Sequence, residues 1–385
     1  MRARHFLSIA GFAETCRNAS NLLASIQYCR QSHKIPATEC VGIAGVPSIN
    51  KIPRMIKLFV ILLPFLVFAS FPSTLQAQGK PQEISICFYD LGKFTSGESP
   101  EKKAILKQSI KDINPDILVL SGIKDEKALA EIGKFLPDAK FAKMIESEDK
   151  ERHIAIISKI KPQETKELTD LKYSIKDVEL PIQRGFLDCV FKSGEYVFHL
   201  IAADLKNRDK VEGFNQTDMR RYEARLLRYY VTGIIKENEE SNIMVAADLN
   251  DTCGMAPIKE IYNRRFNIIK KLYDVRPLDS LKTSWTHWNS DNDDYERIDY
   301  FIATSSLIPE ISREKTRICE NSKWDRISSH RPIVTTIVCK DEERWTKEKL
   351  DSVYPNAIYE GPAGHFEKDK PIGEKLKRNP PRKDQ

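Results

Sequence analysis

The sequence lacks several patterns that would assign it to a common class at once. None of its eight cysteines forms a C-x-x-C pair, which argues against a zinc ribbon. No internal repeat appears at the periods of about 20 to 50 residues that mark solenoids and propellers. Residues 81–385 also carry almost no net charge. Of the 61 basic and 55 acidic residues, nine and two lie in residues 1–80, which leaves 52 and 53 for the remainder. The basic pI of about 8.7 is therefore weak evidence for nucleic-acid binding.

An apolar run of membrane length is missing too. The stretch from Leu58 to Ala69 is shorter than the roughly 20 residues of a spanning helix, and Pro64 interrupts it. It lies within residues 55–77, where a basic start, an apolar core and a small, polar end follow the order of a secretory signal peptide. We therefore predict a signal peptide at 55–77, a non-native or unstructured extension at 1–54, and export to the periplasm or secretion. The alternative is a genuine extension followed by an uncleaved signal anchor through residues 55–77.

Five cysteines follow this leader. Cys87, Cys189 and Cys339 lie in apolar, strand-like runs and are interpreted as small buried hydrophobic residues. Cys253 and Cys319 lie in polar, loop-like stretches, and an exported location would permit them to pair. The sequence alone leaves that pairing open.

Apolar runs of strand length alternate with amphipathic segments over most of the remaining chain. We predict strands at 83–89, 117–120, 153–158, 186–191, 196–203, 243–247, 297–303 and 332–338, and helices at 101–111, 127–135, 217–236 and 257–262. Some strands follow one another directly and others are separated by helices, which favours a mixed-sheet α/β fold. Residues 341–385 are polar and rich in proline, and we predict a disordered tail there. The folded domain is accordingly expected to span residues 78–340.

Polar side chains mark the ends of the predicted strands. Asp90, Asp204 and Asp248 each follow an apolar run, Asp299 lies near the start of another, and His330 precedes the last. Ligands and chemistry gather at the carboxyl ends of strands in α/β sheets. Carboxylates with a histidine and no thiol ligand suit a hard divalent cation such as Mg²⁺, Mn²⁺ or Ca²⁺.

Asp248 and Asn250 end the most abrupt of these runs, in the segment SNIMVAADLNDT (241–252). Two residues apart on an extended chain, their side chains point the same way, so a carboxylate and a carboxamide would lie side by side. The alternative is a simple turn in which both side chains only cap the backbone.

In this order the segments resemble the endonuclease/exonuclease/phosphatase superfamily. The resemblance rests on VAADLNDT (245–252), ERIDYFIAT (296–304) and SSHRPIV (328–334), supported by PDILVL (115–120), RHIAIISK (152–159) and RRYEARLL (220–227). It implies a four-layer sandwich, in which two mixed β-sheets face each other and helices flank them. It also implies metal-dependent hydrolysis of phosphate esters.

The resemblance assigns catalytic roles to four residues. Asp248 corresponds to the Asp that orients the attacking water, and Asn250 to the Asn beside the scissile phosphate. His330 corresponds to the histidine at the phosphate, and Asp299 to the carboxylate that holds that imidazole. A buried carboxylate in this position fixes the tautomer of the histidine and stabilises its cation.

The metal-site motifs of the family are altered in this chain. The Glu that is the principal metal ligand corresponds to Gly122, and the Asp of the Ser-Asp-His motif corresponds to Ser329. Asp90 and Asp204 stand where the family has Asn and His. We therefore predict a rebuilt cation site of Asp90, Asp204 and Asp248, for Mg²⁺ first, with Mn²⁺ or Ca²⁺ as alternatives. The alternative for Asp90 and Asp204 is a strand-end cap or a solvated loop residue.

These assignments favour an exported, divalent-metal-dependent phosphoesterase. Its substrate would be a phosphate ester in a nucleic acid, a lipid head group or a small molecule. A nuclease is included, although the near-neutral body argues against the basic groove of a nonspecific one. The arginines of the predicted helix 217–236 are interpreted as a solvated face. The alternative is a catalytically inactive protein of the same fold that acts as a binding module. No obligate protein partner is indicated, and we expect a monomer.

Overall fold

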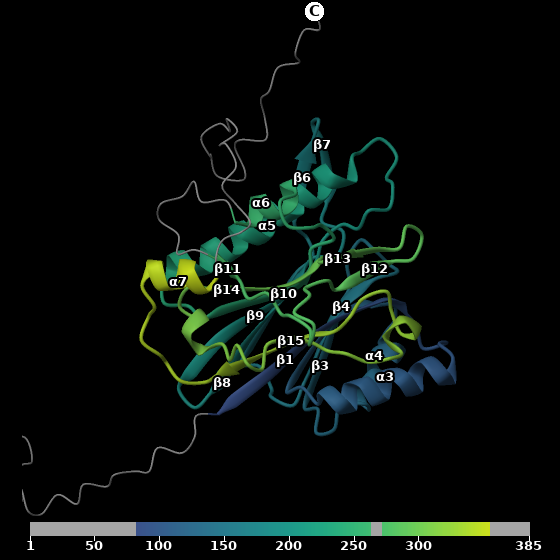
Figure 1. Ribbon diagram of the computed structural model, residues 1–385. Coiled ribbons are helices and arrows are strands. Elements are labelled where there is room, and N and C mark those ends of the chain that lie inside the picture. Colours follow the sequence, from purple (N-terminus) through teal and green to yellow (C-terminus); the bar gives the residue numbers. More distant parts are fainter. Residues whose placement is uncertain (1–81, 263–271, 355–385) are drawn as a thin grey trace, which may run out of the picture. The chain divides into compact units, whose positions relative to one another are not determined.

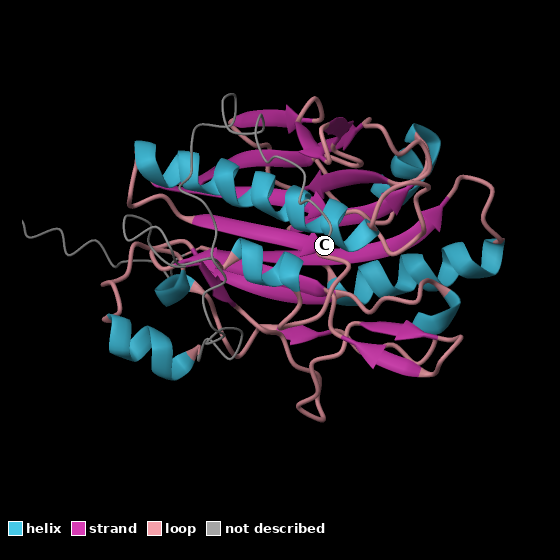
Figure 2. Ribbon diagram, turned by 90° about the horizontal axis from the view of Figure 1, so that it is seen from above, coloured by secondary structure: helices cyan, strands magenta, loops and turns pink. Residues whose placement is uncertain are grey.

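The computed structural model describes residues 82–262 and 272–354. The predicted extension 1–54, the predicted signal peptide 55–77 and residues 355–385 of the predicted tail lie outside the described residues. The described part contains two six-stranded sheets with helices around them (Figures 1 and 2). No helix in this part combines the length and apolarity needed to cross a bilayer.

The first sheet has the strand order β15-β16-β1-β2-β4-β3, and β1 runs parallel to β2 but antiparallel to β16. Its strands are β1 (Glu83–Phe94), β2 (Ile117–Ile123), β3 (Phe141–Ile145), β4 (His153–Ser158), β15 (Arg317–Ile318) and β16 (Ile333–Val338). The second sheet has the order β11-β14-β10-β9-β8-β5, and β10 runs parallel to β9 but antiparallel to β14. Its strands are β5 (Glu164–Leu168), β8 (Phe186–Ser193), β9 (Tyr196–Asp204), β10 (Ile243–Asp248), β11 (Leu272–Asp274) and β14 (Asp299–Thr304). Both sheets are therefore mixed, as predicted.

Helices and two hairpins complete the described chain. The hairpins pair β6 (Lys172–Ile175) with β7 (Val178–Pro181) and β12 (His287–Asn289) with β13 (Asp294–Glu296). The helices are α3 (Pro100–Ile113), α4 (Glu126–Gly133), α5 (Gln216–Glu237), α6 (Ala256–Ile261) and α7 (Lys347–Val353), with short 3-10 turns η2 (Ile308–Glu310) and η3 (Trp324–Arg326). Figure 1 shows α3 and α4 beside the first sheet, and α5 and α6 beside the second.

The central strands are buried on both faces, which explains their continuous apolar runs. In β10, Met244 and Ala246 pack between the two sheets, whereas Val245 and Ala247 pack on the face that α5 covers. On the outer side of the first sheet, a third apolar cluster joins β1, β2 and β4 to α3 and α4. Three apolar layers between four layers of secondary structure confirm the predicted sandwich.

The folded chain continues past the point where the tail was predicted to begin. The side chain of Thr346 accepts the N–H of Lys349 and caps α7, while Leu350 and Tyr354 join the apolar cluster between the sheets. The predicted boundary at Asp341 is therefore too early. Leu350 and Tyr354 anchor this segment to the core, although its composition is mostly polar and most of its other residues stay exposed.

The arginines of α5 do not form the predicted solvated face. Arg220 and Arg228 are buried. Arg220 pairs with Asp251 at 3.0 Å, while Arg225 and Arg228 both pair with Glu260 of α6 at 3.0 Å. These ion pairs hold α5 to α6 and to the chain that follows β10, because a buried guanidinium needs a counter-charge.

The five cysteines of the described residues are free. Cys87 and Cys189 are fully buried, as predicted, whereas Cys339, predicted to be buried too, is only partly buried. Cys253 is exposed and Cys319 is buried, so the disulfide that the sequence left open is not formed.

Two glycines bring β1 and β2 unusually close together. Gly92 and Gly122 have φ of +72° and +70°, in the left-handed region that favours glycine. A Cβ added at Gly122 would lie 2.4 Å from the carbonyl oxygen of Gly92. No side chain fits at position 122 without a backbone shift, and this is where the resemblance has its metal-ligating Glu.

This close approach predicts an unequal cost of two glycine substitutions. Gly122→Ala should lower the free energy of unfolding by about 2–4 kcal/mol, because a backbone clash is added to left-handed strain. Gly194→Ala is the matched control, since Gly194 has φ of +61° but nothing within 4 Å of its added Cβ. Gly194→Ala should lower the free energy of unfolding only by the left-handed strain, about 1–2 kcal/mol. Denaturant unfolding measures both, and equal losses would contradict the close packing at Gly122.

Candidate functional site

A row of carboxylates closes one end of the apolar layer between the sheets. The strand register places Asp248 beside both Asp204 and Asp299, on the neighbouring strands β9, β10 and β14. Each aspartate lies two positions from a residue of the central cluster, namely Ala246, Ala202 and Phe301. Because side chains alternate along a strand, all three carboxylates face the space between the sheets.

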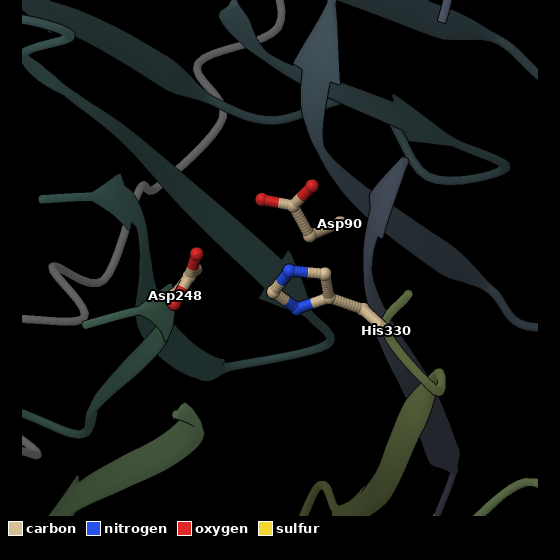
Figure 3. Close-up of side chains that lie close together, drawn as sticks. All are labelled: Asp90, Asp248 and His330. Atoms are coloured by element: carbon tan, nitrogen blue, oxygen red, sulfur yellow. The ribbon is translucent and has the colours of Figure 1, made fainter. Parts of the chain in front are cut away.

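Asp90 of the first sheet faces the same space, because it lies two positions after Phe88 on β1 and Phe88 belongs to the central cluster. Asp90 is buried, and its Oδ1 accepts the N–H of Gly92 at 2.6 Å. Figure 3 shows Asp90, Asp248 and His330 gathered in one place. One potential ligand atom from each of these three lies within 4.8 Å of the others.

His330 and Asp299 form the pair that the resemblance implied. The imidazole Nδ1 lies 3.0 Å from Asp299 Oδ2 and 3.1 Å from Oδ1, and both side chains are buried. Burial alone would lower the pKa of His330, but the carboxylates of Asp299 and Asp90 outweigh it and raise that pKa to about 10. At neutral pH the ring is an imidazolium among carboxylates.

Asp248 fits both interpretations that the sequence left open, a carboxylate of a functional site and a backbone-capping turn. Its Oδ1 accepts the N–H of Asn250 at 2.8 Å, and Asn250 has φ of 51°, so the segment does form a capped turn. The same carboxylate also belongs to the group with Asp90 and His330. Burial, followed by the charge of Asp299, raises the pKa of Asp248 well above its usual range. A carboxylate of raised pKa is a better proton acceptor.

Asp204 does not belong to that group of three, and its role as a metal ligand stays a prediction. Its Oδ1 lies 2.6 Å from Nη1 of Arg184, and its Oδ2 accepts the hydroxyl of Ser121. Burial raises the pKa of Asp204 to about 6, although the Arg184 charge acts in the opposite direction. Unlike Asp248, Asp204 has a guanidinium that already neutralises its carboxylate.

The donor set fits a divalent cation at Asp90, Asp248 and His330. Two carboxylates and an imidazole are ordinary ligands of such ions. The charges agree, because Arg184 neutralises Asp204, and Asp90, Asp248 and Asp299 remain beside a ligating His330, which would be neutral. The place that the resemblance implies does not fit, because Gly122 has no space for a side chain and Ser329 is exposed.

Sequence reasoning missed two residues of this site. Arg184 precedes Gly185 in the loop between β7 and β8, where nothing local distinguishes it from a surface arginine. His287 on β12 has its ring centroid 4.6 Å from that of His330, and its buried Nδ1 has no hydrogen-bond partner within the described chain. Burial and the His330 charge lower the pKa of His287 to about 4, so it stays neutral. A single histidine in the segment WTHW has no spacing that marks a site.

Comparison with known proteins adds the fold to this geometry. Neither a family model nor a curated protein matches the sequence significantly. Among solved structures, an endonuclease/exonuclease/phosphatase family protein from Bacteroides thetaiotaomicron is similar at 14% identity and a TM-score of 0.51, over 69% of this chain and 98% of that chain. The chain has the endonuclease/exonuclease/phosphatase fold. The implied resemblance is thus confirmed at the level of the fold.

Two further structures show weaker similarity. Truncated TDP2 from Caenorhabditis elegans is 15% identical with a TM-score of 0.47, over 66% of this chain and 98% of that chain. A beta toxin from Staphylococcus aureus is 13% identical with a TM-score of 0.48, over 66% of this chain and 99% of that chain. At such identities the chemistry has to be argued from the residues of this chain.

The His330–Asp299 pair predicts a specific titration. In Asp299→Asn the pKa of His330 should fall well below 10, because burial then acts with one less carboxylate opposing it. A pKa raised by folding stabilises the native state fully below the unfolded value of about 6.5, and this contribution is lost as the pH rises through about 10. NMR titration of the His330 ring measures the change. Asp188→Asn is the control, since Asp188 lies 3.0 Å from a different histidine, His199. An unchanged His330 pKa in Asp299→Asn would contradict the pairing.

Proposed function

We propose that this protein is an exported hydrolase of phosphate ester bonds that works with a divalent cation. The observation that carries the proposal is the gathering of Asp90, Asp248 and the Asp299–His330 pair at one end of the central core. The shared endonuclease/exonuclease/phosphatase fold supports it. The site lies at the carboxyl ends of β9 and β10, where α/β sheets commonly place their chemistry, and Asp90 joins it from within β1.

The residues of this chain would divide the work as follows. Asp90, Asp248 and His330 would hold the cation, which requires His330 to release its proton. Asp299 accepts a hydrogen bond from Nδ1 and so fixes the ring, which leaves the lone pair of Nε2 to bind the cation, the usual arrangement of a ligating histidine. Asp248 also orients the attacking water and accepts its proton. When bound, the cation supplies positive charge against the charge that develops on the phosphate.

The structure bears on the class of substrate. The α5 arginines that could have lined a basic groove are engaged by Glu260 and Asp251. With a near-neutral body, a compact phosphate ester is therefore favoured over nonspecific binding to a nucleic-acid backbone. The second candidate is the binding module, favoured by the missing space for a ligand at Gly122.

One assay series tests the enzyme. The full chain is given bis(4-nitrophenyl) phosphate, 4-nitrophenyl phosphate or plasmid DNA, with Mg²⁺, Mn²⁺, Ca²⁺ or chelator. We expect cation-dependent turnover of at least one substrate. Asp248→Asn should lower the rate by roughly 10²–10⁴-fold, because proton transfer and cation binding both suffer. Asp188→Asn, at a similarly buried carboxylate that contacts His199 and Tyr230, should leave the rate unchanged.

A negative result would be equally informative. Absence of turnover on all three substrates, with no cation binding by calorimetry, contradicts the enzyme and favours the binding module. Turnover that persists in chelator would contradict the cation. Loss of activity in Asp188→Asn as well as in Asp248→Asn would point to general destabilisation.

Export rests on residues 55–77 and has its own test. We expect a mature form that begins at Gln78, because Ala77 ends the small, polar region of the signal pattern. Mass spectrometry of the N-terminus in the periplasm and medium measures it. Leu62→Arg, in the apolar core, should leave the precursor inside the cell, whereas Lys51→Ala should have no effect. An uncleaved form in the membrane fraction would favour the signal anchor.

A further inference from the structure

Arg184 is the largest fully buried side chain of the described residues. Its Nη1 donates to Asp204 Oδ1 at 2.6 Å and to the carbonyl oxygen of Leu205 at 2.8 Å, and its Nε donates to Asp149 Oδ2 at 3.1 Å. A buried guanidinium is costly unless it is paired in this way. The next residue, Gly185, fixes the backbone, because a Cβ there would lie 2.6 Å from the carbonyl oxygen of Leu168. Arg184 therefore holds the tip of β9 from a rigid position.

The same Asp204 oxygen also contacts Asn250. The Asn250 Nδ2 lies 3.0 Å from Asp204 Oδ1, 2.9 Å from the Leu205 carbonyl oxygen and 2.7 Å from Asp248 Oδ2. Two of these three acceptors are the ones that Arg184 holds. Without the guanidinium, Asp204 would be a buried carboxylate lacking its ion-pair partner, and its position would not be maintained.

These acceptors decide which way the carboxamide faces. A flipped amide would set its oxygen against two carboxylates and a carbonyl, all of which repel it. The nitrogen must therefore face inward. The outward Oδ1 has no hydrogen-bond partner within the described chain, yet it is not among the buried unpaired atoms, so it keeps access to solvent.

We infer that the buried Arg184–Asp204 pair is a positioning element that directs the Asn250 amide nitrogen at Asp248, a member of the candidate site. The two hydrogens of that nitrogen face Asp204, the Leu205 carbonyl and Asp248. Asn250 thus holds Asp248 in place rather than acting as a donor to phosphate. The consequence for cation binding rests on the proposed function, while the orientation itself does not.

A double substitution at Arg184 and Asp204 separates their effect on the position of the Asn250 side chain from their effect on the stability of the protein. Replacing both members of a buried ion pair by apolar residues costs less than removing one, so Arg184→Met/Asp204→Leu should fold. Its melting temperature should fall moderately, because Asp149 and Ser121 lose their partners. Two readouts on the full chain should nevertheless change. The side-chain NH₂ of Asn250 should lose its protection from hydrogen exchange in NMR spectra. The affinity for Mn²⁺, measured by calorimetry, should fall about 10–100-fold, as for other residues that orient metal ligands.

Further variants control the comparison. Arg184→Lys keeps the charge but not the planar fork, and should restore part of both readouts. Tyr196→Phe/Glu310→Leu removes another buried hydrogen-bonded pair, at the opposite end of β9, and should change neither. If the double variant does not fold, Asp204→Asn removes the carboxylate with little change of volume and gives the same comparison.

The outcomes separate this inference from the proposed function. A folded double variant with wild-type amide protection overturns the positioning role. Unchanged Mn²⁺ affinity with lost protection overturns the effect of Asn250 on cation binding through Asp248. If the wild type itself binds no Mn²⁺, the proposed cation site fails, and the amide exchange still decides whether Arg184 and Asp204 hold Asn250.

Discussion

The alternation of side chains along the central strands is the constraint on which the site depends. Residues of one parity fill the space between the two sheets, and the apolar series runs out at the same end of β1, β9, β10 and β14. At that end the next side chain of the same parity is a carboxylate on every one of these strands, so Asp90, Asp204, Asp248 and Asp299 meet without any loop having to position them. The packing that stabilises the fold is therefore also what assembles the site.

Four buried carboxylates so close together would repel one another, and two internal cations, Arg184 and His330, reduce this repulsion. Arg184 neutralises Asp204 from within the protein, and the imidazolium of His330 lies against Asp299. Asp90 and Asp248 keep the remaining negative charge, which a divalent cation would match. The fold is shared with endonuclease/exonuclease/phosphatase proteins, but here a fixed guanidinium and a glycine contact occupy the region where the resemblance has a Glu and a His.

Much of the fold follows from local patterns, and the reasons are visible in particular residues. The doubly buried strands have uninterrupted apolar runs, and Asp248 and Asp299 end or begin such runs directly. The contact between His330 and Asp299 could be anticipated from the resemblance. The tail boundary could not, because Leu350 and Tyr354 are isolated apolar residues whose burial depends on a distant surface. The ion pair of Asp204 could not be anticipated either, because its partner, Arg184, is a loop arginine without any local signal.

By itself the sequence determined the apolar runs of the central strands, the helix between β9 and β10, and the placing of carboxylates beside those runs, since these depend on the period of side chains and on local capping. The shorter and more exposed strands, such as β3 and β5, were not predicted. Only the tertiary structure decided which carboxylates share a site. The choice depends on register between strands far apart in sequence and on which oxygen a buried arginine reaches. The tertiary structure also decided that position 122 has no space for a metal-ligating side chain. A Cβ there would lie 2.4 Å from the carbonyl oxygen of Gly92, thirty residues earlier in the chain.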